Sequence, residues 1–186
     1  MNVSIFVGDI ADADADALCT STNPRLSLRM GTGASVLERG GSAVSRACEA
    51  IVLAGPLPAG SAHATTAGNL PHKVVIHCVA SDAGHRSSTE IVRLCVRNAV
   101  RISTGAGCAS LALPILASGH AHVRFDDSVQ TIAEELRSAS LERAVFVVND
   151  PDRAEPARAI VRRVLGGDVE IVTSTRVEPE PASPWD

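Results

Sequence analysis

A carboxylate placed at the end of an apolar run is the first feature of the sequence that could bind a ligand. Asp9 directly follows an alternating apolar segment at residues 3–7 and Gly8. A carboxylate just beyond a strand can accept a hydrogen bond from an exocyclic amine, such as that of a purine base. The same side chain can also cap a turn, because aspartate often bonds its own backbone two residues on. The sequence leaves both roles open for Asp9.

Two further segments place small residues where backbone N–H groups could bind an anion. Gly31, Thr32 and Gly33 lead into a segment with helical periodicity, and the free N–H groups at a helix N-terminus attract phosphate. Ser118 and Gly119 follow an apolar run at residues 110–114, where a loop of small residues can wrap its N–H groups around an anion. Each segment also suits an ordinary turn, so neither identifies a site by itself.

Other reactive side chains suit structural roles better. His120 and His122 have the spacing of a metal-binding pair, but no third ligand is placed beside them, and zinc sites use at least three protein ligands. His77 lies inside an apolar run and is interpreted as a buried core residue. The alternating aspartates of residues 12–16 offer too few oxygen ligands for calcium. We therefore expect no metal site and no cofactor.

The elements that must position these segments alternate between strand and helix. Apolar runs predict strands over residues 3–7, 17–19, 62–67, 73–79, 110–114, 144–148 and 169–172. Helical periodicity predicts helices over 35–53, divided at Gly40-Gly41, and over 89–103, 126–137 and 153–165. This alternation indicates an α/β fold of three layers, with a mixed, mostly parallel sheet between helices. Ligands of such sheets bind at the carboxyl ends of the strands, here the loops 8–14, 20–33, 80–88, 115–125 and 149–152.

Composition limits the class of protein. The 186 residues are 45% hydrophobic and 20% charged, which allows one domain with a buried core. The net charge of -4 argues against nonspecific nucleic-acid binding, which usually needs a basic excess. None of the five cysteines forms a C-x-x-C pair, so we expect free buried thiols and a cytoplasmic protein with no membrane partner. Residues 1–175 should form the domain, and residues 176–186, rich in proline and acid, a flexible tail. A composition rich in alanine and arginine suggests a bacterial genome.

Taken together, the segments resemble the macrodomain family, whose usual function is to bind ADP-ribose. The family's G-D-I, D-A-I-V-N-A-A-N and glycine-run motifs appear at residues 8–10, 16–23 and 29–33. Its K-x-V-I-H strand and its S-I-A-F-P strand with the following phosphate loop appear at residues 73–77 and 110–119. The resemblance extends in consistent order over residues 3–165 and implies the three-layer α/β/α fold of the family.

The resemblance also implies a role for each matching position. Asp9 and the Ile10 backbone would bind adenine, and Asn23 would reach the distal ribose. Gly31, Thr32 and Gly33 would approach that ribose and the diphosphate. The second phosphate loop would consist of Ser118, Gly119, His120, Ala121 and His122, and Asn149 would lie beside the base. The implied partner is ADP-ribose or an ADP-ribosylated protein.

Three departures from the family pattern bear on activity. Hydrolytic relatives carry V-D-G-A-I after the glycine run, and Gly33 stands at the aspartate, which removes a candidate general base. The stretch around residues 29–41 instead resembles the macro module of a large histone variant, a branch associated with binding. The aromatic of the second phosphate loop is replaced by Ala121, and Asn149 replaces the aromatic that stacks on adenine.

These departures favour a reader of ADP-ribose or of a closely related nucleotide. Two alternatives remain open at this point. One is a hydrolase of ADP-ribosyl or O-acetyl-ADP-ribose linkages that lacks the loop aspartate, and so works by substrate-assisted chemistry. The other is a degenerate macrodomain that serves as an interaction or RNA-binding module.

Overall fold

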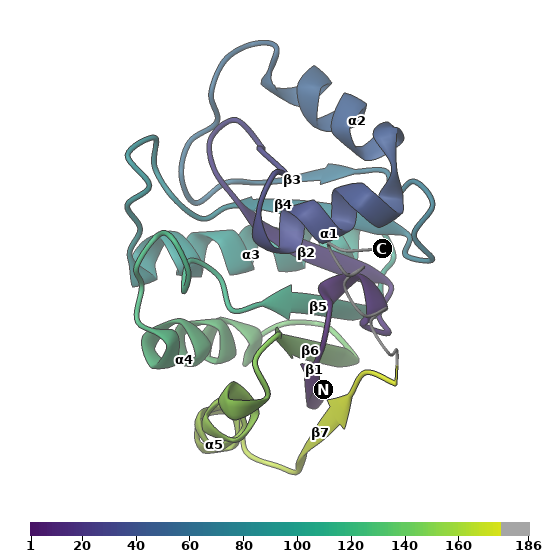
Figure 1. Cartoon of the computed structure of the whole chain (residues 1–186). Coiled ribbons are helices and arrows are strands. Elements are labelled where there is room, and N and C mark those ends of the chain that lie inside the picture. The colour runs from purple at the N-terminus through teal and green to yellow at the C-terminus, as the bar shows by residue number, and fades with distance from the viewer. Residues whose placement is uncertain (176–186) are drawn as a thin grey trace, which may run out of the picture.

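A computed structural model describes residues 1–175, and the predicted tail at 176–186 lies outside the described residues. One sheet with strand order β3-β4-β2-β5-β6-β1-β7 runs through the middle of the molecule (Figure 1). Its strands are β1 (Asn2–Val7), β2 (Ala17–Thr22), β3 (Ala62–Thr65), β4 (Val74–Val79), β5 (Ser110–Pro114), β6 (Arg143–Val148) and β7 (Val169–Thr173). The helices are α1 (Gly31–Gly40), α2 (Ser42–Val52), α3 (Thr89–Gly105), α4 (Phe125–Leu136) and α5 (Ala154–Leu165), with short 3₁₀ turns η1 (Ile10–Asp12) and η2 (Pro151–Arg153).

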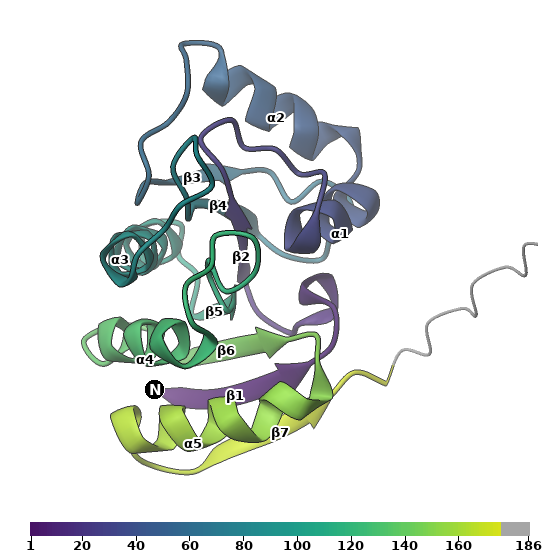
Figure 2. The same cartoon turned by 60° about the vertical axis from the view of Figure 1, so that its left-hand side comes forward.

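The sheet is mixed and mostly parallel, as the alternation of strands and helices predicts. β3 pairs with β4 in the antiparallel sense, and every other pairing within residues 1–175 is parallel. Helices α3, α4 and α5 cover one face of the sheet, and α1 and α2 cover the other (Figures 1 and 2). The predicted three-layer α/β/α fold is therefore confirmed.

Alternating strand residues supply the two cores. Ile76, Leu113 and Phe146 point into the core beneath α3, α4 and α5. Their chain neighbours Val75 and Ala112 point into the core beneath α1 and α2. A sheet buried on both faces needs apolar residues at consecutive positions, which explains why these strands appear in the sequence as continuous apolar runs.

Element boundaries differ from the predicted ones mainly beside the glycine loop. The predicted division of the long helical segment is confirmed, because Gly41 has φ 78° and separates α1 from α2. Helix α1 begins at Gly31, before the first periodic apolar residue, and β2 continues through Thr22, beyond its apolar part. Hydrophobic periodicity misses the first turn of α1 and the last residues of β2 because both are polar. Both segments lie at the carboxyl edge of the sheet.

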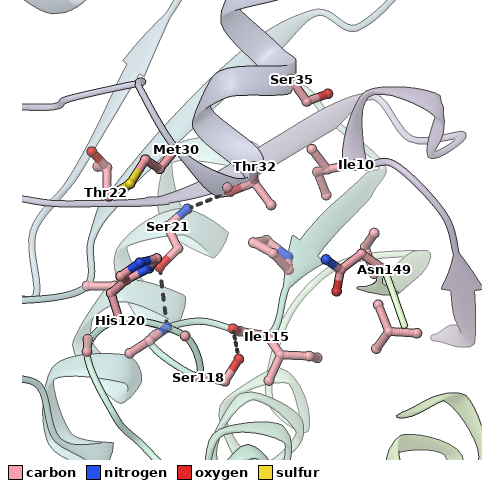
Figure 3. Close-up of a pocket in the computed structure, with 18 of the residues that line it drawn as sticks. Ile10, Ser21, Thr22, Met30, Thr32, Ser35, Ile115, Ser118, His120 and Asn149 are labelled. Atoms are coloured by element: carbon pink, nitrogen blue, oxygen red, sulfur yellow. Dashed lines mark hydrogen bonds between the residues drawn. The ribbon is translucent and has the colours of Figure 1, made fainter. Parts of the chain in front are cut away.

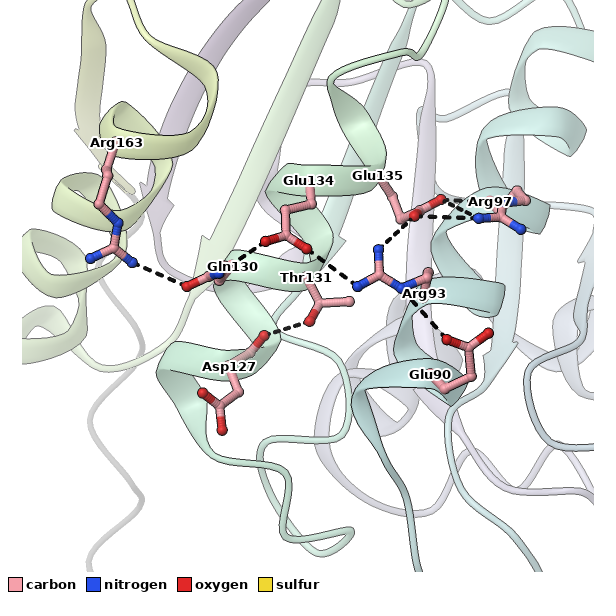
Figure 4. Close-up of polar contacts among 9 residues, drawn as sticks. All are labelled: Glu90, Arg93, Arg97, Asp127, Gln130, Thr131, Glu134, Glu135 and Arg163. Atoms are coloured by element: carbon pink, nitrogen blue, oxygen red, sulfur yellow. Dashed lines mark hydrogen bonds and ion pairs between the residues drawn. The ribbon is translucent and has the colours of Figure 1, made fainter.

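Ion pairs and a hydrogen bond connect the three helices on one face. Arg93 of α3 bonds Glu134 and Glu135 of α4, and Arg163 of α5 donates to Gln130 of α4 (Figure 4). These carboxylates raise the pKa of Arg93. Partly exposed pairs of this kind contribute little each, so burial in the two cores stabilises the helices more than the ion pairs do.

Within residues 1–175 no helix is both long enough and apolar enough to cross a bilayer.

His77 is buried in the middle of β4, as its apolar surroundings predict. Its Nδ1 lies 2.9 Å from Thr20 Oγ1, and its Nε2 lies 2.8 Å from Thr65 Oγ1 and 3.5 Å from Cys48 Sγ. Burial lowers the pKa of His77 from 6.5 to about 4, with a smaller contribution from His63. The ring is therefore neutral in the folded protein at neutral pH.

Acid should destabilise the fold through His77. An unfolded histidine gains its proton near pH 6.5 but the folded one only near pH 4, so stability present above 6.5 is lost as pH falls through that window. The loss should reach about 2 kcal/mol at pH 5. Urea unfolding at pH 7.5 and pH 5 of the parent and of His77→Gln, whose side chain does not titrate, measures it. If the free energy of unfolding falls equally in the two proteins, the acid sensitivity belongs to groups other than His77.

Candidate functional site

A cavity of about 590 Å³ opens at the edge where the parallel strands end. The segments that follow β1, β2, β4, β5 and β6 all contribute to its wall, together with the start of α1. Ile10 and Asn149 lie on one side of the cavity, and Thr22, Met30 and His120 lie on the other (Figure 3). All the predicted site residues except Gly33 and His122 lie on this wall.

Asp9 has the capping role that the sequence offers, and one of its carboxylate oxygens is left over. Its Oδ1 accepts the Ala11 N–H at 2.8 Å, which caps η1, and also accepts the Ser35 hydroxyl. Within residues 1–175 no hydrogen-bond donor contacts Oδ2. Since Asp9 lies on the cavity wall beside Ile10, one oxygen orients the side chain and the other remains available to a ligand amine.

Gly8 explains how Asp9 comes to stand at this position. Its φ of 154° is a conformation that L side chains rarely adopt, and its N–H continues the ladder by donating to Val148 O at 2.9 Å. A Cβ at residue 8 would come within 2.8 Å of Ser174 Cβ and 3.1 Å of the Phe6 ring. The chain therefore passes tightly between two neighbours before it turns Asp9 into the cavity.

The N-terminus of α1 faces the middle of the cavity. Gly31 and Thr32 line the wall, and the preceding Met30 gives the helix no side-chain cap. The first N–H groups of a helix have no partner within the helix, so those of α1 can bind an anion. Thr32 Oγ1 accepts the Ser21 N–H at 3.3 Å, which joins the start of α1 to the end of β2 (Figure 3).

The loop after β5 faces the same space and has a conformation set by its own hydrogen bonds. Ser118 Oγ donates to Ile115 O at 2.8 Å, and Ala117, with φ 58°, donates its N–H to Ser21 Oγ at 3.3 Å. The N–H groups of Gly119, His120 and Ala121 have no acceptor within the described part of the chain. Consecutive free N–H groups in a turn form a concave site for an anion.

Gly33 and His122 are the two predicted site residues that do not line the cavity. Gly33 is buried, and a Cβ there would stand 3.0 Å from Leu28 Cα and 3.2 Å from Leu28 Cδ2. A carboxylate at this position would therefore need Leu28 to move. His122 has φ 59° and closes the loop by donating its N–H to Gly119 O at 3.1 Å.

Asn23 lies on the cavity wall, but its side-chain oxygen already accepts two hydrogen bonds from the protein. Asn23 Oδ1 accepts the N–H groups of Arg25 and Ser27, at 3.0 and 3.3 Å. These bonds shape the loop between β2 and α1, so the amide nitrogen of Asn23 is the group left for a ligand.

Sequence reasoning missed several wall residues that only the fold brings to the cavity. The most informative are Phe125, at the start of α4, and Arg153, at the end of η2, because the Arg153 guanidinium carbon lies 4.9 Å from the centre of the Phe125 ring. Arg29, Ser35, Ser81 and His85 also line the wall. The predicted ligand loops include Arg29, Ser81, His85 and Phe125, but nothing in the local pattern marks these side chains.

Comparison with known proteins agrees with this geometry. The family model described as Macro domain matches residues 19–132. The chain belongs to the macrodomain family. An uncharacterized protein of Mycobacterium tuberculosis is 31% identical over 160 residues, which make up 84% of this chain but only 44% of that protein. The chain thus spans less than half the length of this relative.

Solved macrodomains share the fold at low sequence identity. The Oceanobacillus iheyensis macrodomain with ADP superimposes with a TM-score of 0.77 at 17% identity, over 86% of this chain and 89% of that one. The Trypanosoma brucei macrodomain in complex with ADP-ribose gives 0.76 at 17% identity, over 84% and 67%. At this identity the likeness demonstrates a common fold.

Proposed function

We propose that this macrodomain is a reader that binds ADP-ribose, free or attached to a protein, in the cytoplasm. The observation that carries the proposal is one cavity whose wall holds a free carboxylate oxygen and two sets of free backbone N–H groups. Adenosine diphosphate, with an exocyclic amine on its base and an anionic diphosphate, has a partner group for each of these. The structures of family members with ADP and ADP-ribose support the same ligand class.

Each part of the ligand has a matching part of the wall. Asp9 Oδ2 accepts the adenine N6 amine, and Ile10 packs on the base. The N-terminus of α1 and the N–H groups of residues 119–121 bind the diphosphate, which needs no basic side chain because backbone dipoles supply the positive field. The distal ribose then reaches Asn23, next to Thr22 and Met30.

Calorimetry with ADP-ribose, ADP, AMP and NAD tests this assignment directly. ADP-ribose should bind most tightly, because only it fills both the base end and the distal end without adding nicotinamide. ADP should follow, and AMP should be weakest because it offers one phosphate to two sets of N–H groups. Equal affinity for AMP and ADP-ribose would remove the diphosphate from the proposed site.

The cavity favours binding over hydrolysis. Asp9 and Asp150 are the two carboxylates on its wall in the described residues. Asp9 orients η1, while Asp150 Oδ1 caps η2 by accepting the Asp152 N–H at 3.0 Å. Neither comes from the glycine loop, where Gly33 has no room for a carboxylate without movement of Leu28. Among the described residues, the glycine loop therefore supplies no carboxylate that could act as a general base for water.

We accordingly expect little or no removal of ADP-ribose from a modified protein. A de-modification assay on a mono-ADP-ribosylated protein, run beside an active macrodomain, measures this. Binding of ADP-ribose by the same sample serves as the control for a folded, competent site. Turnover comparable with that of the active enzyme would contradict the reader assignment and would favour substrate-assisted hydrolysis.

A further inference from the structure

Arg153 and Phe125 form a contact that closes one side of the cavity. Phe125 follows the loop that carries the free N–H groups, whereas Arg153 follows Asn149, the residue after β6. The Arg153 guanidinium lies over the Phe125 ring at 4.9 Å, a cation–π distance. Two loops that end far apart in sequence are thus joined by an arginine held in a defined plane.

The hydrogen-bonding edge of this arginine is not occupied by the protein. Its Nε lies 3.9 Å from Asp150 Oδ2, which is a long ion pair, and 53% of the side chain is exposed. Among residues 1–175 no acceptor lies within hydrogen-bond distance of its two terminal amino groups. Asp150 and the exposed Asp152 reduce the local positive field but leave those amino groups free to bind an anion.

The position of the contact identifies which part of a ligand it meets, if the nucleotide lies as proposed above. The base end lies at Asp9 and Asn149, and the phosphate end lies at residues 119–121. Arg153 follows the segment at the base end, and Phe125 follows the loop at the phosphate end. The contact between them therefore lies beside the part of the ligand that links the base to the phosphates. In a nucleoside diphosphate that connection is the ribose attached to the base.

We propose that Arg153 forms a subsite for a phosphate ester on this ribose, at its 2′ or 3′ hydroxyl. A phosphomonoester carries about -1.5 to -2 charges at neutral pH, and arginine binds it through two parallel N–H groups. An arginine near the ribose also accommodates the 2′-phosphate in dinucleotide-binding folds. Stacking on Phe125 holds the guanidinium plane in advance, which lowers the entropy lost when the phosphate binds.

The test compares ligands that differ only by the ribose phosphate. ADP-ribose is compared with ADP-ribose 2′-phosphate, and AMP with adenosine 2′,5′-bisphosphate and adenosine 3′,5′-bisphosphate, by calorimetry. The unmutated protein should bind each ribose-phosphorylated ligand about tenfold more tightly than the matched ligand that lacks this phosphate. Whether the 2′ or the 3′ compound gains identifies the hydroxyl. The ratio should shrink as salt is raised, because the added attraction is between partly exposed charges.

Variants separate this subsite from a general effect of charge. In Arg153→Ala the ratio should fall to about one, and Arg153→Lys should keep part of it, since a lysine retains the charge without the planar fork. Arg158→Ala removes one charge from α5 beyond the cavity wall and should keep the full ratio. A ratio of one or less in the parent, or an undiminished ratio in Arg153→Ala, overturns the inference. If ADP-ribose itself fails to bind, the proposed function fails as well, whereas ADP-ribose binding without a phosphate preference overturns the Arg153 subsite alone.

Discussion

Gly119→Glu should abolish ADP-ribose binding and leave the protein folded. A Cβ built on Gly119 meets no heavy atom within 4 Å, so the folded chain has room for the side chain. Gly119 lines the cavity wall beside the free N–H groups of the loop, so a long side chain there can enter the space that the ligand needs. A glutamate there adds bulk where the diphosphate must lie and a negative charge beside an anion. We expect affinity to fall by more than about a thousandfold, since both close approach and charge complementarity are lost.

Two matched substitutions make this result specific. Gly105→Glu, at the end of α3, adds the same side chain at another position where a Cβ meets nothing within 4 Å, away from the cavity wall. It should bind ADP-ribose as the parent does. Gly119→Ala should weaken binding to an intermediate degree. Thermal melting confirms that each variant is folded, and unchanged calorimetric affinity in a folded Gly119→Glu would show that the ligand does not occupy this loop.

Asp9→Asn should reverse the preference between adenine and hypoxanthine. The amide keeps the oxygen that accepts from Ala11 and Ser35, so η1 remains capped. It replaces the free oxygen with an NH₂ group, which repels the adenine N6 amine but donates to the O6 of hypoxanthine. The parent should prefer ADP-ribose to its inosine analogue, and the variant should prefer the analogue. The ratio of the two affinities should change by about a thousandfold, because one charge-assisted bond is lost and one new bond is gained.

Calorimetry with both ligands on both proteins measures this ratio. The melting temperature serves as the stability control, because an intact cap predicts no more than a small shift. The Ser35→Ala variant, which removes one of the two donors to Asp9, should weaken binding without reversing the preference. An unchanged ratio in a folded Asp9→Asn protein would place base recognition elsewhere on the wall.

Local sequence pattern was sufficient for the elements and for the edge that carries the site. Residues 110–114 and 73–79 are apolar at consecutive positions, because both faces of a parallel sheet are buried, and the structure has strands there. Strands that run in parallel end at one edge, so the loops after residues 7, 19, 79, 114 and 148 were predictable as ligand loops without knowledge of strand order. Asp9, Gly31 and Gly119 were found in this way.

Only the tertiary structure decided what each loop residue meets. Gly33 belongs to the predicted glycine loop, yet it is buried next to Leu28 and does not line the cavity. Arg153 and Phe125 come together because β6 stands beside β5 in the sheet, an order that no local period encodes. Periodicity in a sequence reports which side of an element is buried, whereas contacts between loops depend on the order of the strands that carry them. The sequence alone therefore determined a macrodomain-like fold with its ligand edge, and the packed sheet determined which side chains form the cavity and which close it.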